Sequence, residues 1–232
     1  MLATTIYTLV AQSRVLPKYR VALVMSSMVT FIAAYHYFRI FNSFEESSNG
    51  YAVMIGVGKG AFNEAYRYVD WILTVPLLLV EVVAVLALAK AASTSLIQRL
   101  VPASAAMIAL GYPGEISSDN GTKTLYGVLS TIPFLYILYV LFVELSKSLD
   151  RQPEGVAATV GRLRLLLIAT WGVYPISYLL PLLGQDINDP NLFMWRQVGY
   201  TVADVLAKCV FGLTIFKIAR MKSVAEGMKD DH

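Results

Sequence analysis

Charged residues are scarce in this chain of 232 residues. Asp, Glu, Lys and Arg make up 15% of the sequence, and 56% of the residues are hydrophobic. An average soluble domain carries about 25% charged residues. The deficit indicates a membrane protein, and the length leaves little room for a separate soluble domain, so we expect residues 1–232 to form a single domain. The net charge of +3 is too small to indicate a nucleic-acid partner.

Cysteine is almost absent as well. Cys209 is the only one, which excludes an intrachain disulfide and leaves the redox compartment undefined. The first 13 residues lack the basic start and the continuous apolar stretch of a signal peptide. Nothing in the sequence indicates a metal site.

Seven stretches are long and apolar enough, or nearly so, to cross a bilayer core of ~30 Å, which needs about 20 residues per helix. They cover residues 1–13, 20–42, 66–89, 94–113, 122–148, 161–184 and 194–220. We therefore expect an all-α fold, a bundle of seven transmembrane helices. The first stretch is too short to span, and a half-span would expose backbone polar groups to lipid. The first helix is therefore expected to be truncated in this chain.

The 19 Lys and Arg residues fix an orientation. If the N-terminus lies outside, thirteen of them fall on the inner side and Lys208 lies within a span. The five on the outer side are Arg39, Lys59, Arg67, Lys123 and Arg196. The outer loops are acidic and carry Glu45, Glu46, Glu115, Asp119, Asp186 and Asp189. Because positive residues gather on the cytoplasmic side, we expect an external N-terminus and a cytoplasmic C-terminus in a multi-pass protein of the cell membrane.

Ionisable residues within the predicted spans are functional candidates, since burying them in a membrane is costly. In the third stretch, Asp70 and Thr74 share one helix face, and Glu81 returns to within about 20° of Asp70 and lies roughly 16 Å further inward. Arg67 lies at the outer end of this helix. In the seventh stretch, the spacing of four residues places Asp204 and Lys208 on one face.

Two interpretations of these charges stay open at this point. Lys208 can form a structural ion pair with Asp204 or Asp70, and Glu81 can extend toward the inner surface. Alternatively, a buried lysine can form a Schiff base with an aldehyde, which, once protonated, would need carboxylates nearby. The depth of Lys208 within its span favours the functional interpretation.

Three motifs in order resemble the third, sixth and seventh helices of microbial rhodopsins. They are Arg67–Glu81 (RYVDWILTVPLLLVE), Trp171–Tyr178 (WGVYPISY) and Asp204–Lys208 (DVLAK). Two more segments narrow the resemblance to the proteorhodopsin and xanthorhodopsin group, with xanthorhodopsin-like proton pumps nearest. They are Tyr35–Arg39 (YHYFR) and Gly111–Glu115 (GYPGE).

The resemblance implies roles for the buried charges. Lys208 would carry all-trans retinal as a protonated Schiff base, with Asp70 as primary counterion and proton acceptor. Asp204 would be the second counterion. Thr74 would support Asp70 from the next turn, and Glu81 would be the cytoplasmic proton donor.

Together these roles imply a light-driven outward proton pump, a transporter rather than an enzyme. Arg67 would shape its exit side. A histidine matching His36 pairs with the acceptor aspartate in this group, which would favour ionised Asp70; a packed or interfacial histidine is the alternative. A photoreceptor that signals through a separate partner is the competing function. A transporter or channel without retinal would not explain why the Lys208 and Trp171 motifs occur together.

The resemblance also implies the walls of a pocket. Trp71, Trp171 and Tyr174 would surround the polyene, although aromatic residues in a span commonly serve packing alone. Tyr200 lies on the face of Asp204 and could form a hydrogen bond near the counterions. Leu78 matches a position where an apolar residue accompanies green rather than blue absorption.

Gly127 raises the prospect of a second pigment. In xanthorhodopsin-like members a glycine here replaces a bulky aromatic residue and opens a window beside the retinal ring, where a hydroxylated carotenoid antenna can lie. Close packing between helices is the alternative for a glycine in a membrane. The resemblance further implies a homo-oligomer, such as a pentamer, in the lipid bilayer.

Overall fold

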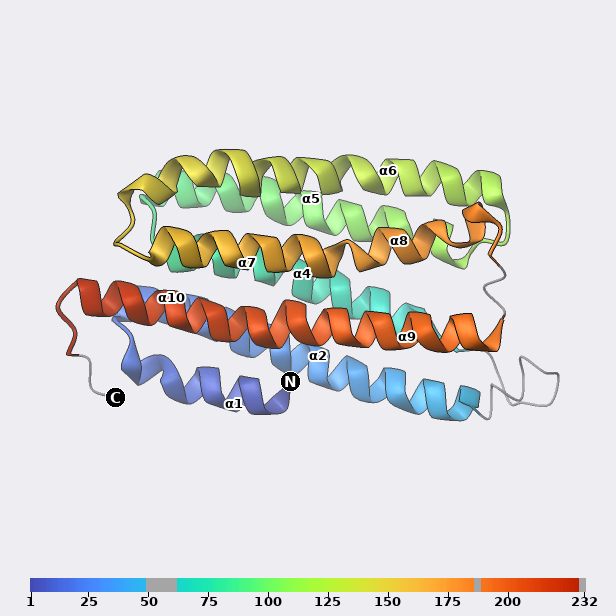
Figure 1. Cartoon of the computed structure of the whole chain (residues 1–232), viewed down its shortest axis with the longest axis horizontal. Coiled ribbons are helices and arrows are strands. Elements are labelled where there is room, and N and C mark those ends of the chain that lie inside the picture. The colour runs from blue at the N-terminus through green and yellow to red at the C-terminus, as the bar shows by residue number, and fades with distance from the viewer. Residues whose placement is uncertain (49–61, 186–188, 230–232) are drawn as a thin grey trace.

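All regular structure in the computed structural model, which describes residues 1–48, 62–185 and 189–229, is helical (Figure 1). The helices are α1 (Leu2–Val10), α2 (Arg20–Ser48), α4 (Ala65–Leu86), α5 (Lys90–Ile116), α6 (Asn120–Tyr139), α7 (Val156–Trp171), α8 (Val173–Leu179), α9 (Pro190–Val205) and α10 (Phe211–Ala225). Gly172 joins α7 to α8, and a π turn at Leu206–Val210 joins α9 to α10. The described residues thus form seven rods side by side, which confirms the predicted seven-helix bundle.

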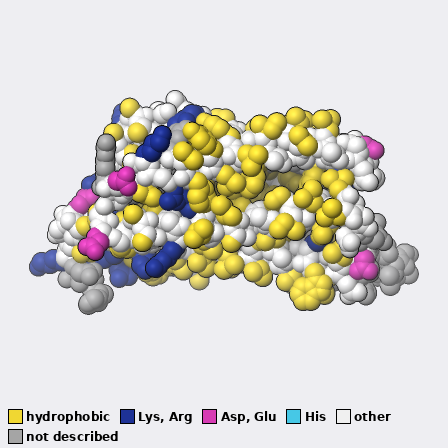
Figure 2. All heavy atoms as spheres, turned by 45° about the horizontal axis from the view of Figure 1, so that its top comes forward, with side chains coloured by type: hydrophobic (Ala, Val, Ile, Leu, Met, Phe, Trp, Pro, Cys, Tyr) yellow, Lys and Arg dark blue, Asp and Glu magenta, His cyan; other side chains and the backbone are white. Residues whose placement is uncertain are grey.

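The connections alternate between the two ends of the bundle (Figure 1). At one end lie the linkers 11–19, 87–89 and 145–155 and the segment that follows α10. We call this the basic end, because it carries Arg14, Lys18, Lys147, Arg220, Lys222 and Lys229. Figure 2 shows hydrophobic side chains over much of the displayed face between the two ends. The sequence-based assignment of Lys59 and Asp186 to the other end falls outside the described residues.

Four helices in the described ranges are long and apolar enough to cross a membrane. They are Pro17–Phe44, Ala65–Leu86, Asn120–Val143 and Val156–Leu179. Each overlaps a predicted span. α5 begins four residues before the predicted span 94–113 and continues through Pro102 and Pro113.

Helix α4 lies at the centre of the bundle and α6 at its edge. In the most apolar window of α4, 61% of the residues are buried, against 17% in that of α6. Helices α2 and α5 pack on α4. Polar side chains on α4 therefore face other helices rather than lipid, which is where a membrane protein tolerates them.

Three cations that the sequence assigns to the outer side are buried. Arg67, Lys123 and Arg196 have exposed fractions of 1%, 5% and 8%. Arg196 lies 2.8 Å from Glu115 in an ion pair, and Lys123 donates to the last carbonyls of α5. Tertiary partners, which sequence spacing does not reveal, compensate the cost of burying these charges.

At the start of α6 the structure shows an ordinary helix cap. Asp119 accepts a hydrogen bond of 2.6 Å from the backbone N–H of Thr122, as expected of an aspartate at this position. The hydrogen bond lowers the pKa of the exposed Asp119 carboxyl, because it favours the ionised form. This cap fixes where α6 begins, beside the end of α5.

Candidate functional site

Lys208 lies between two carboxylates in the middle of the bundle. Its Nζ is 2.6 Å from Asp70 Oδ2 on α4 and 2.7 Å from Asp204 Oδ2, one turn earlier on its own helix. All three residues are at most 2% exposed. Removing one member of such a buried group typically costs about 3–5 kcal/mol, because an uncompensated charge stays behind. The structure thus brings together the three residues that the sequence analysis selected.

The helix widens where Lys208 is attached. Leu206–Val210 forms a π turn between α9 and α10, and Lys208 is its middle residue. Single π turns inside α-helices are frequent at functional sites. Nothing in the spacing of the sequence predicts this turn.

The two carboxylates differ in their hydrogen bonds. Tyr37 donates to Asp204 Oδ2 at 2.6 Å, Trp71 Nε1 donates to the same group at 3.2 Å, and Tyr174 donates to its Oδ1. Asp70 Oδ1, in contrast, is buried without a hydrogen-bond partner among the described residues. Since hydrogen bonds to a carboxylate favour its ionised form, Asp204 is held as the anion and Asp70 keeps an oxygen that can take a proton.

His36 lies beside Asp70 but is bonded to its own helix. Its Nδ1 is 3.8 Å from Asp70 Oδ1, too far for a hydrogen bond, and 3.0 Å from the carbonyl oxygen of Ile32. An N–H at Nδ1 would donate to Ile32. Thr74 also contacts Asp70 through the backbone, since its hydroxyl donates to the Asp70 carbonyl at 2.8 Å.

Arg67 continues the polar network away from the basic end. Its Nη1 lies 3.4 Å from the Tyr37 hydroxyl, and its Nη2 donates to the Gln197 side chain. Its Nε is 3.7 Å from a carboxylate oxygen of Glu64, at the start of α4. Sequence patterns assigned no role to Gln197 or Glu64, and Tyr37 appeared only as a member of the motif Tyr35–Arg39. A hydrogen-bonded route from Asp204 toward the end opposite the basic end therefore passes through Tyr37 and Arg67.

Tyr200 contributes its ring to this region. The guanidinium carbon of Arg67 lies 4.6 Å from the ring centroid, and that of Arg196 lies 5.8 Å from it. The ring also stacks on Tyr174 at 5.8 Å. Besides these ring contacts, the Tyr200 carbonyl accepts a hydrogen bond of 3.2 Å from the Tyr37 hydroxyl, which also donates to Asp204. Tyr200 thus makes a hydrogen bond near the counterions through its backbone.

Glu81 is isolated on the other side of Lys208. It is fully buried, its Oε1 accepts a hydrogen bond from the Ser26 hydroxyl of α2, and its Oε2 has no partner in the described part of the chain. Gly212 on α10 leaves room for this pair, since an added Cβ would lie 3.0 Å from Ser26 Oγ and 3.8 Å from Glu81 Oε1. A buried acid without a cation beside it is favoured in its neutral form.

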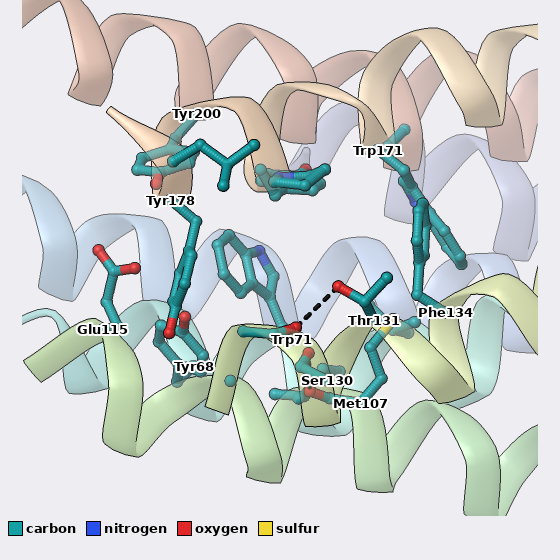
Figure 3. A pocket seen from close by; sticks show the side chains of 18 of the residues that line it. Tyr68, Trp71, Met107, Glu115, Ser130, Thr131, Phe134, Trp171, Tyr178 and Tyr200 are labelled. Atoms are coloured by element: carbon teal, nitrogen blue, oxygen red, sulfur yellow. Dashed lines mark hydrogen bonds between the residues drawn. The ribbon is translucent and has the colours of Figure 1, made fainter. Parts of the chain in front are cut away.

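A cavity of about 280 Å³ adjoins Lys208. It is close in size to small ligand sites, which begin near 300 Å³. Trp71 projects into it, Trp171 and Phe134 lie toward one end, and Tyr178 lies toward the other (Figure 3). All the residues that the sequence assigned to the pocket line this cavity: Trp71, Leu78, Gly127, Trp171, Tyr174 and Tyr200.

The cavity also reaches the edge of the bundle at Gly127. Val128, which is 57% exposed, lines it from α6. A Cβ at Gly127 would lie 2.8 Å from Cε1 of Tyr178, and the Tyr178 hydroxyl donates to the carbonyl of Lys123 at 2.7 Å. Gly127 therefore permits a close approach of Tyr178 while it borders the cavity.

Comparisons with known proteins agree with this geometry. The profile of the family described as "Bacteriorhodopsin-like protein" matches residues 1–221. The chain is 29% identical to the green-light absorbing proteorhodopsin of Gamma-proteobacterium EBAC31A08 over 96% of this chain and 83% of that protein. It is 32% identical to the bacteriorhodopsin of Haloterrigena sp. (strain arg-4) over 84% of this chain and 73% of that protein.

Two solved structures are similar over nearly the whole chain. A thermophilic rhodopsin is 42% identical with a TM-score of 0.89. Xanthorhodopsin, described as a light-driven ion pump with dual chromophore, is 46% identical with a TM-score of 0.87. Each likeness covers 98% of this chain and 90% of the other.

Replacement of Gly212 tests the Ser26–Glu81 contact. In Gly212→Ala the new Cβ should push the Ser26 hydroxyl from Glu81, because the 3.0 Å separation is too short for an unadjusted contact. The infrared carbonyl band of Glu81 should then shift to higher frequency as it loses a hydrogen bond. Gly161→Ala is the control, since its Cβ would meet nothing within 4 Å. An unshifted Glu81 band in Gly212→Ala would show that Ser26 does not bind Glu81.

Proposed function

Because the chain belongs to the family of bacteriorhodopsin-like proteins, we propose that it is a light-driven outward proton pump with all-trans retinal attached to Lys208. The observation that carries this proposal is the placement of Lys208 between Asp70 and Asp204 at the wall of an apolar cavity, with Glu81 isolated beyond it. The chain is a multi-pass membrane protein of the rhodopsin type. Assembly into a homo-oligomer stays a prediction.

The cavity suits retinal in position and chemistry. It begins at Lys208, the residue that can attach an aldehyde, and its walls are aromatic and aliphatic, with Trp71, Leu78 and Trp171 among them. The two carboxylates provide the negative charge that a positively charged attachment nitrogen requires. When bound, retinal supplies light absorption and an isomerisation that moves the proton on Nζ relative to these carboxylates.

Asp70 is the better of the two acceptors for that proton. Three side-chain donors already stabilise the Asp204 anion, whereas Asp70 Oδ1 lacks a partner among the described residues. A proton transferred from Lys208 Nζ to Asp70 neutralises both groups, and Asp204 keeps the negative charge next to Arg67 and Tyr37. The route through Tyr37 and Arg67 then provides a polar exit away from the basic end.

Glu81 is suited to return a proton to Lys208. It shares the α4 face of Asp70 but lies eleven residues closer to the basic end, and its buried neutral form holds a proton that it can give. We place the basic end in the cytoplasm, because Lys and Arg gather on the cytoplasmic side of membrane proteins. A proton accepted by Asp70 leaves toward the outside, and Glu81 regains a proton from the inside. Together these two steps set an outward direction of transport.

Two observations favour a carotenoid antenna beside retinal. The cavity reaches the surface of α6 at Gly127 and Val128, where an elongated apolar pigment could lie. Xanthorhodopsin, 46% identical to this chain, is described as having a dual chromophore. We therefore extend the proposal to a hydroxylated carotenoid bound along α6 near Tyr178.

Retinal attachment is tested by Lys208→Ala. This variant lacks Nζ, so protein mixed with retinal should show no visible band that survives a denaturing wash. Lys123→Met, which removes another buried lysine, should keep the band. A covalent visible band in Lys208→Ala would place the attachment elsewhere.

The donor role is tested by Glu81→Gln. The absorption maximum and the transfer to Asp70 should stay nearly unchanged, because Glu81 touches neither Lys208 nor Asp70. The return of a proton to Lys208 should slow, depend on external pH and recover with added azide. Flash spectroscopy measures each step. Return at the wild-type rate would exclude Glu81 as donor and favour a photoreceptor.

The antenna is tested by Gly127→Trp. The indole should fill the surface opening and displace Tyr178, so excitation energy absorbed by a hydroxylated carotenoid should no longer reach retinal. Tyr178→Phe, which keeps the ring and loses only the hydrogen bond to Lys123, should retain the transfer. Fluorescence excitation spectra compare the three proteins. Equal transfer in Gly127→Trp and wild type would show that no pigment binds at this opening.

A further inference from the structure

A closed layer of side chains separates Glu81 from the basic end. Glu81 is 0% exposed, and one turn further along α4 lie Val85 and Leu86, each 1% exposed, just before the helix ends. Tyr19, the last residue of the linker before α2, is also 1% exposed. A proton can therefore reach Glu81 from the solution at this end only if the layer opens.

Lys222 ties this layer together from α10. The residue is 4% exposed, and its Nζ donates to the carbonyl oxygens of Val85 at 3.2 Å and of Leu86 at 2.5 Å. These are among the last carbonyls of α4, which have no partner within their own helix. Ala87 follows in the left-handed region with φ of 47°, so the helix cannot continue past them. A lysine also complements the negative end of the helix dipole.

The same turn of α10 holds the linker between α1 and α2. The Lys222 Nζ lies 5.0 Å from the centroid of the Tyr19 ring, and the Tyr19 hydroxyl donates to the Glu226 carboxylate. Ser223, the next residue, accepts a hydrogen bond of 2.9 Å from the backbone N–H of Leu16. α10, the end of α4 and the linker therefore meet at Lys222.

We propose that Lys222 keeps the access route from the basic end to Glu81 closed. We call its hydrogen bonds to the carbonyls of Val85 and Leu86 the latch. Its bonds to α4 hold the layer closed, and they must part before water can bring a proton to Glu81. Lys222 is thus a positioning residue that sets the rate at which Glu81 exchanges and regains its proton. This inference rests on the proposed role of Glu81 as a donor that refills from the basic end.

The matched test compares two lysines that make the same kind of contact. Lys123 donates to the last carbonyls of α5 at 3.2 Å each, as Lys222 does for α4, but it lies at the opposite end of the bundle. Lys222→Met and Lys123→Met each remove a charged donor and keep an apolar chain of similar length. Both variants lose a side chain that caps the end of a helix. Only Lys222→Met loses the hydrogen bonds that close the layer over Glu81, so only this variant should change the exchange of Glu81.

The first measurement is hydrogen–deuterium exchange of the Glu81 carboxyl in the dark, followed by infrared spectroscopy on the full chain and assigned with Glu81→Gln. We expect exchange in Lys222→Met to be roughly tenfold faster than in wild type, because opening no longer breaks hydrogen bonds from a charged donor. Lys123→Met should exchange at the wild-type rate. An unchanged rate in Lys222→Met would overturn the latch.

Lys222→Gln and a flash measurement test the same proposal independently of Lys222→Met in the dark. If Lys222→Met does not fold, Lys222→Gln, which keeps a neutral donor, should still exchange faster than wild type. After a flash on retinal-loaded protein, proton uptake from the medium should also be faster in the variant, while transfer from Glu81 to Lys208 keeps its rate. Absence of a Glu81 carbonyl band in wild type would overturn the donor role itself. If the Glu81 band is present but its exchange rate is the same in wild type and in the Lys222 variants, the latch alone would be overturned.

Discussion

The burial of the Lys208 cation between two carboxylates constrains the rest of this structure. An isolated ammonium group in a membrane interior is strongly disfavoured, so Asp70 and Asp204 must both approach within hydrogen-bond distance, from α4 and from the helix of Lys208 itself. Two anions around one cation leave a net negative charge, which Arg67 balances through Tyr37. The central position of α4 follows from this arrangement, because it carries both Asp70 and Arg67.

Direction arises from unequal surroundings on the two sides of Lys208. Away from the basic end, Asp204, Tyr37, Arg67 and Gln197 form a continuous polar network. Toward the basic end, Glu81 has one hydroxyl partner and otherwise apolar walls, and the layer around Lys222 closes the route. One side can conduct a proton away readily, while the other can hold a single proton in store.

Helical periodicity was sufficient to select Asp70, Glu81, Asp204 and Lys208. Asp70 and Glu81 are eleven residues apart on α4, and the same spacing on α2 separates Ser26 from Tyr37, the partners of Glu81 and Asp204. That repeat could have revealed Ser26 and Tyr37, but a serine or a tyrosine in a span carries no charge to draw attention. The π turn at Lys208 and the contacts of Lys123 and Lys222 with helix ends depend on how separate helices meet. Spacing within one helix holds no information about them.

Outward transport of protons by light is tested most directly in intact cells that produce the chain and are supplied with retinal. The external pH is recorded during illumination, with and without a protonophore. Outward pumping should make the medium more acidic in the light, and the protonophore should abolish the change. A medium that stays at constant pH or becomes more alkaline, in cells where the pigment has formed, would contradict outward pumping.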